Sequence, residues 1–131
     1  MKSMWPSDKT VSYESETTLE AKSTPGVRYT IRRISFSLRG DLARRVRELS
    51  GRAEFHAAGD SVQDRIEASV LANEIDQLYL RWGLAGLSGL TIDGEEATVE
   101  TLITKGPEDL ALEIAAAVKR QIGLTEEERK N

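Results

Sequence analysis

Apolar residues between positions 61 and 82 recur at helical spacing on two sides of the segment. Ser61 stands three residues before Asp64, a spacing typical of a helix N-cap. A helical wheel places one apolar stripe on one side (Val62, Ile66, Val70 and Leu80) and a second on the other (Leu71, Ile75, Leu78, Tyr79 and Trp82). Such a helix is either sandwiched inside its own domain or presents one stripe to another chain. In a chain this short the sandwiched arrangement is favoured.

A helix is also predicted just before this one, from an N-cap at Asp41 or a neighbouring residue to a stop at Gly59. Its apolar stripe is narrow and consists of Leu42, Val46, Leu49 and Ala53. Arg44, Arg47 and Glu48 point away from that stripe and are expected to face solvent.

The last third of the chain carries further helix start and stop signals. Thr98 predicts the N-cap of a short helix that ends at Gly106, and Pro107 suits the first turn of the following helix. Gly123 ends that helix, whose predicted buried stripe is Leu110, Ile114, Ala117 and Val118. Thr125 and Glu128 then have capping-box spacing for a final turn.

Two segments read as extended. Apolar residues alternate at Val27, Tyr29 and Ile31, and the phase then slips by one so that Ile34, Phe36 and Leu38 continue it. This predicts one strand with a bulge or bend near Arg32 and Arg33. Residues 90–92 predict a short strand, and Asp93 and Gly94 a tight turn.

Residues 1–26 are polar and end in a turn signal, which predicts a flexible arm. Alternation at 10–15 could add one weak strand if a partner edge is available. We therefore expect a mainly α (α+β) fold, in which residues 27–131 form a single domain of about four helices with a short N-terminal β-strand or hairpin.

The composition fits a globular domain, with 39% hydrophobic and 31% charged residues. The absence of cysteine excludes disulfides, thiolate metal sites and a cysteine nucleophile. No secretory signal and no membrane-spanning apolar run is evident, so we expect a cytoplasmic protein without a membrane partner.

Charge is distributed unevenly although the net value is only −4. Residues 27–52 hold eight arginines against two acids, a net +6, whereas residues 93–113 hold seven acids against one lysine, a net −6. Opposed patches suit a homo-oligomer or a charged partner, although solvation of two separate faces is the commoner explanation. The candidate basic patch is Arg44, Arg45 and Arg47. Nucleic-acid binding is disfavoured, because no recognised motif and no interleaved aromatic platform accompanies the arginines.

The sequence offers no catalytic constellation. His56 is the single histidine, and we expect it at a helix end rather than in a site. No nucleophile elbow, phosphate-binding loop or calcium-binding spacing occurs, and the acids of residues 93–96 are better explained by a turn. We expect no enzymatic activity, no metal and no cofactor.

Several segments together resemble tail assembly chaperones of phages and prophages. The most recognisable are Trp82 with GLSGLTIDG (86–94), KGPEDL (105–110) and LTEEERKN (124–131). The resemblance covers about residues 27–131. It implies a non-enzymatic protein of the host cytoplasm that binds the tape-measure protein and helps recruit the tail-tube protein. On this reading Leu71, Ile75, Leu78, Tyr79 and Trp82 include partner-facing residues.

Many such chaperones are also made in a longer, frameshifted form. Lys130 and Asn131 can be encoded by an A-rich run on which ribosomes slip, so a longer product is expected. The alternatives are a minor virion or head–tail connector protein that uses the arginines and the arm, and a nucleic-acid-binding regulator.

Overall fold

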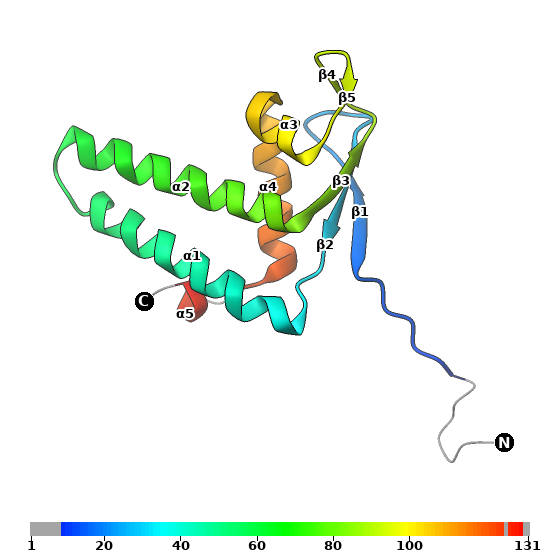
Figure 1. The fold of residues 1–131 in the computed structure, drawn as a ribbon, viewed down its shortest axis with the longest axis horizontal. Helices are drawn as coiled ribbons and strands as arrows, with labels where there is room; N and C mark the ends of the chain where they lie inside the picture. The colour runs from blue at the N-terminus through cyan, green and yellow to red at the C-terminus, as the bar shows by residue number, and fades with distance from the viewer. Residues whose placement is uncertain (1–8, 125, 130–131) are drawn as a thin grey trace.

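The structure is a computed structural model that describes residues 9–124 and 126–129, with the side chains of 126 and 127 excepted. Five helices and five strands occur in these residues, which confirms a mainly helical α+β fold (Figure 1). The helices are α1 (Phe36–Ala57), α2 (Val62–Gly83), α3 (Val99–Lys105), α4 (Glu108–Ile122) and α5 (Glu126–Arg129). The strands are β1 (Glu16–Glu20), β2 (Arg28–Arg32), β3 (Leu84–Ser88), β4 (Thr91–Ile92) and β5 (Glu95–Glu96).

Helix α1 begins earlier than the sequence predicted. Ser35 is the N-cap, and its side chain accepts a hydrogen bond from the backbone N–H of Leu38 at 3.2 Å. The predicted continuation of the strand through Ile34, Phe36 and Leu38 is therefore wrong, and so is the N-cap at Asp41. The alternation was misleading because Phe36 is fully exposed and Leu38 is 41% exposed, and of these three residues only Ile34 packs against the core.

Helices α1 and α2 form an antiparallel hairpin that extends away from the rest of the domain (Figure 1). Ser61 is the N-cap of α2, as predicted, and accepts a hydrogen bond from the backbone N–H of Asp64 at 3.0 Å. Leu42 and Val46 are buried, which confirms part of the stripe expected for α1. The burial of the hairpin is confined to its base, since none of residues 47–70 is fully buried.

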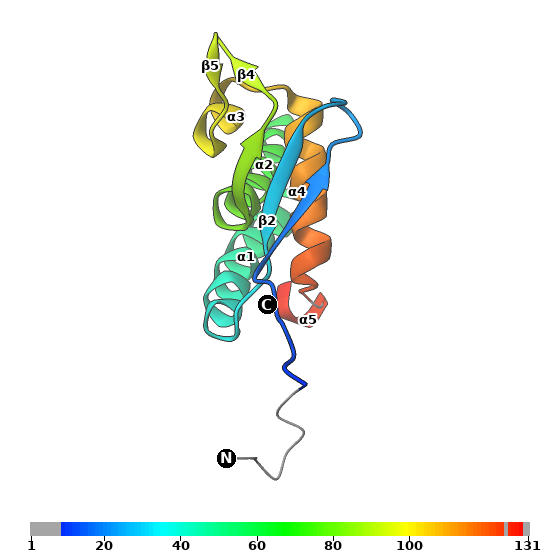
Figure 2. The same ribbon diagram turned by 90° about the vertical axis from the view of Figure 1, so that its right-hand side faces the viewer.

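A three-stranded antiparallel sheet of order β1-β2-β3 covers one side of α4 (Figure 2). Tyr29 and Ile31 point inward and are buried, while Thr18 and Thr30 pair through their hydroxyls on the outer face, 2.8 Å apart. The register of β2 against β3 shifts between Thr30 and Ile31. The irregularity therefore lies one to two residues before the predicted position at Arg32 and Arg33.

Part of the predicted arm belongs to the folded domain. Strand β1 lies within the segment predicted as an arm, and Ala21, which follows β1, is buried. The Glu113 carboxylate of α4 accepts hydrogen bonds from the backbone N–H groups of Lys22 and Ser23, at 2.7 and 2.8 Å. These bonds hold the β1–β2 turn on α4. The boundary at residue 26 is consequently too late, because the ordered sheet already begins at Glu16.

Helix α4 is the centre of the core. Leu110, Ile114 and Val118 are 0% exposed and Ala117 is 4% exposed, which confirms the whole predicted stripe, and Ile122 extends it at 1%. At Gly83 the end of α2 approaches α4 closely, because an added Cβ would lie 2.3 Å from a methyl of Val118. Gly123 ends α4 in the left-handed conformation, as predicted. The predicted cap at Thr125 lies outside the described residues.

The acidic segment around Asp93 is a β-hairpin. Asp93 and Gly94 have φ values of 53° and 81°, as a tight turn between β4 and β5 requires. Thr98 then caps α3 in a reciprocal arrangement with Thr101. The predicted turn and cap are therefore confirmed.

Gly89 joins this hairpin to the sheet and should not tolerate a side chain. Its φ is +82°, and an added Cβ would lie 2.4 Å from the Gly26 carbonyl oxygen. We expect Gly89→Ala to lower the free energy of unfolding by more than about 1 kcal/mol in urea denaturation. Gly40 lies in α1 with open space around it, so Gly40→Ala should instead raise it by up to about 1 kcal/mol. Equal effects of the two substitutions would contradict this account.

Candidate protein-binding surface

An exposed apolar stripe runs along the distal half of α2. Val62, Ile66 and Val70 are 61%, 57% and 45% exposed. Their spacing of four residues places them on one face of the helix. Together with Arg65, Ser69 and Asn73 they line a shallow hollow. We call Val62, Ile66 and Val70 the α2 stripe.

The residues predicted to face a partner lie on the opposite side of α2. Leu71 and Tyr79 are buried in the core, and Ile75, Leu78 and Trp82 are partly buried against it. The structure thus brings these five residues together as packing contacts of the domain. The wheel had also grouped Leu80 with the α2 stripe, but Leu80 is buried because α3 and α4 cover this end of the helix.

The apolar path continues beyond the α2 stripe towards α4. A second hollow lies between α2, α3 and α4, and Asn73 lines both hollows. The apolar lining of this second hollow includes Ile103 of α3 and Leu112 of α4, and Leu112 is 49% exposed. The exposed α2 stripe itself, from Val62 to Val70, follows the helix for about 12 Å at the usual helical rise. It is long enough to lie alongside about two turns of a second helix.

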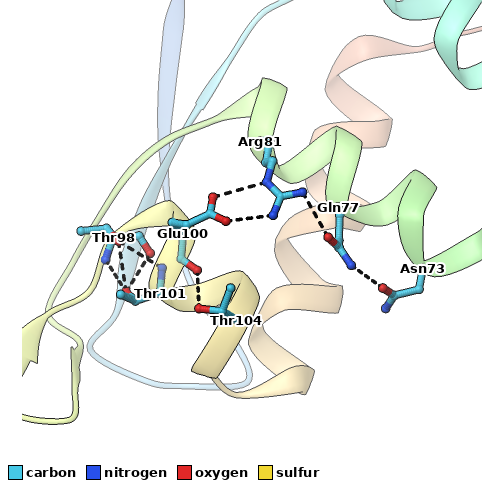
Figure 3. Close-up of polar contacts among 7 residues, drawn as sticks. All are labelled: Asn73, Gln77, Arg81, Thr98, Glu100, Thr101 and Thr104. Carbon is cyan, nitrogen blue, oxygen red and sulfur yellow. Dashed lines mark hydrogen bonds and ion pairs between the residues drawn. The ribbon is translucent and has the colours of Figure 1, made fainter. Parts of the chain in front are cut away.

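A chain of polar contacts borders this path and joins α2 to α3 (Figure 3). The guanidinium of Arg81 donates to both carboxylate oxygens of Glu100, at 2.9 and 3.3 Å, and to the Gln77 side-chain oxygen at 3.1 Å. Gln77 in turn donates to the Asn73 side chain. The hydrogen bond from Arg81 holds the pKa of Glu100 below its ordinary value. This paired geometry fixes α3 against the base of the hairpin.

The predicted basic patch lies on the outer face of α1. Arg44, Arg45 and Arg47 are all exposed, Arg44 forms an ion pair with Asp41 at 3.5 Å, and Glu48 lies beside Arg44 and Arg47. The sequence reasoning missed an aromatic residue in this patch. Phe55 is 74% exposed and lines the same hollow as Arg44, Arg47 and Arg52. Its position eleven residues after Arg44 was the available signal, because that spacing returns to the same helical face.

His56 closes the end of the hairpin. Its Nδ1–H donates to the Asp64 carboxylate at 2.9 Å, and the Ser61 hydroxyl donates to the other carboxylate oxygen at 2.8 Å. His56 is therefore at a helix end, as expected. These bonds, that of His56 first, hold the pKa of Asp64 below its ordinary value.

This contact predicts a pH dependence at the hairpin end. A carboxyl whose pKa is lower in the folded state stabilises that state above the unfolded pKa of about 3.9, and the contribution is lost as the pH falls through the folded pKa. We expect His56→Ala to raise the pKa of Asp64 towards its ordinary value in a carboxyl NMR titration. Arg52→Ala, on the same helix but outside the contact, is the control. An unchanged Asp64 titration in His56→Ala would contradict the assignment.

Neither a metal centre nor a membrane span is found in the part of the chain that the structure describes. No group of three or more His, Cys, Asp or Glu residues is placed to hold an ion there. None of the described helices is both long and apolar enough to cross a bilayer. Comparisons with protein-family models, with curated proteins and with solved structures gave no match.

Proposed function

We propose that this chain is a tail assembly chaperone of a phage or prophage, and that it acts by binding. Its α2 stripe would hold an amphipathic helix of the tape-measure protein while the tail tube assembles around that protein. Catalysis has no part in this function. The proposal rests on the sequence resemblance for the identity of the partner and on the exposed stripe for the manner of binding.

The observation that carries the binding mode is the exposure of Val62, Ile66 and Val70 on a hairpin that extends from the domain (Figure 1). An amphipathic helix presents apolar residues at similar intervals and can lay them along such a stripe. Arg65 and the contacts of Gln77 and Arg81 provide a polar border. Polar borders favour one orientation of the partner and limit nonspecific association.

The direct test is co-expression with a tape-measure protein from the same genome, followed by pull-down. A tape-measure protein should be retained and should become soluble only when this chain is present. Failure of the folded chain to bind it would reject the proposal.

A minor virion or head–tail connector protein is the second candidate, favoured by the extended arm and by the exposed arginines of α1. The content of purified particles separates the two functions. A chaperone should be absent from the particles, whereas a connector should be present in a fixed number of copies.

A further inference from the structure

The segment before β1 is an extended arm that leaves the domain. Residues 9–15 point away from the sheet and the helices in both views (Figures 1 and 2). Val11 is 91% exposed and Tyr13 is 67% exposed. Arg33 holds the part of the arm next to β1, because it donates its backbone N–H to the Ser15 carbonyl at 2.9 Å and places its guanidinium over the Tyr13 ring. The arm thus has the alternating apolar pattern of a strand but no sheet beside it.

The sheet has a free edge that suits an additional strand. In the order β1-β2-β3, strand β3 is an edge, and no described strand lies beyond it. Backbone groups on such an edge can pair with a strand from another chain. A hollow runs along this edge, lined by residues 84–87 of β3, by residues 97–100 and by Arg32 and Arg81. Leu87 and Val99 in it are only partly buried.

We propose that the arm of one copy, residues 9–15, adds as a fourth strand to the β3 edge of a second copy. The arm's own β3 lies at the far side of the sheet, with β2 between, and the arm leads away from it (Figure 2). The β3 edge of a second copy is not held behind β2 of the arm's own chain, so it can lie beside the arm. Val11 and Tyr13 then cover Leu87 and Val99, which gives the exposed apolar residues of the arm a partner.

Charge favours β3 over the other free edge, β1. The arm leads through Glu14 into β1, which itself carries Glu16 and Glu20. Pairing the arm with β1 of a second copy would bring carboxylates together, which destabilises a strand pair. Strand β3 holds no charged residue, and the hollow beside it includes Arg32 as well as Arg81, which is paired with Glu100. Each copy donates one arm and accepts one, so the assembly is a reciprocal dimer or a closed ring.

Because the chain contains no cysteine, single-cysteine variants can report which strands meet. We would mix Ser12→Cys with Ser88→Cys and treat the mixture with a short bismaleimide. A crosslinked product between the two variants is expected. The matched control replaces Ser88→Cys with Thr18→Cys on the outer face of β1, and should give little product.

A second measurement tests the backbone pairing. Val11→Pro with Tyr13→Pro removes two N–H donors from the arm, whereas Val11→Thr with Tyr13→Thr keeps them. Sedimentation equilibrium should show self-association weakened at least about tenfold more in the proline variant than in the threonine variant. A monomer at every concentration would overturn the proposal. Crosslinking of Ser12→Cys to β1 alone would also overturn it, and so would equal self-association of the proline and threonine variants. The same holds if the β3 edge is occupied only by a strand of a different protein. None of these outcomes bears on helix binding by the α2 stripe.

Discussion

The double substitution Ile66→Asp and Val70→Asp is expected to weaken the proposed binding of a tape-measure helix. Both side chains are about half exposed in the free chain, and binding would bury them. Burying one fully exposed aliphatic side chain contributes about 1.5–3 kcal/mol, so burying the exposed halves of two contributes as much in total, and its loss should weaken binding at least about tenfold. The affinity can be measured by titration calorimetry with a tape-measure fragment.

The domain itself should be unaffected by these changes. Substitutions at exposed sites usually alter stability by less than about 0.5 kcal/mol. Phe36→Asp is the matched control, because Phe36 is a fully exposed apolar residue on α1 rather than on the α2 stripe. Binding should survive in this control. Equal loss of binding in both variants would place the contact elsewhere, and unchanged binding in both would remove the α2 stripe from the mechanism.

Ile114→Ala is expected to have the largest effect on stability. Ile114 is 0% exposed at the centre of α4, where it belongs to the core shared by the sheet, α2 and α3. Truncating such a side chain removes its burial and leaves a cavity, which together cost about 2–5 kcal/mol. Urea denaturation should show the corresponding fall in the unfolding midpoint.

The control for this substitution lies two residues away on the same helix. Leu112 is 49% exposed, so Leu112→Ala should lower the free energy of unfolding by much less than Ile114→Ala. Similar losses for the two variants would mean that α4 does not hold the core as described.

Local signals in the sequence were sufficient to predict where most helices begin or end. Ser61 with Asp64, Thr98 and Gly123 each specify a boundary through their own side chain or backbone, so these positions could be predicted. Strand β3 could not, because its LAGLS sequence has small residues and no clear alternation. It is a strand because β2 lies beside it, and that pairing joins residues far apart in the chain.

The proposed binding surface was predictable only in part. The wheel identified two apolar stripes on α2, but it could not tell which one the domain would cover. That choice depends on where α1 packs and on where α4 crosses the base of the hairpin. Leu71 faces inward for this reason, and Ile66 remains outside. The basic patch on α1 was easier to predict, because charged residues opposite a buried stripe face solvent in almost any packing.

The lack of buried residues between positions 47 and 70 has a consequence for how the chain moves. The far end of the hairpin has little buried apolar surface to keep it closed, so its amides should open locally at a lower free energy than those of α4. Amide hydrogen exchange would therefore be fast around residues 58–70 and slow along Leu110–Ile122. A helix docked on the α2 stripe would slow exchange first in this far end of the hairpin, where the free chain is least protected.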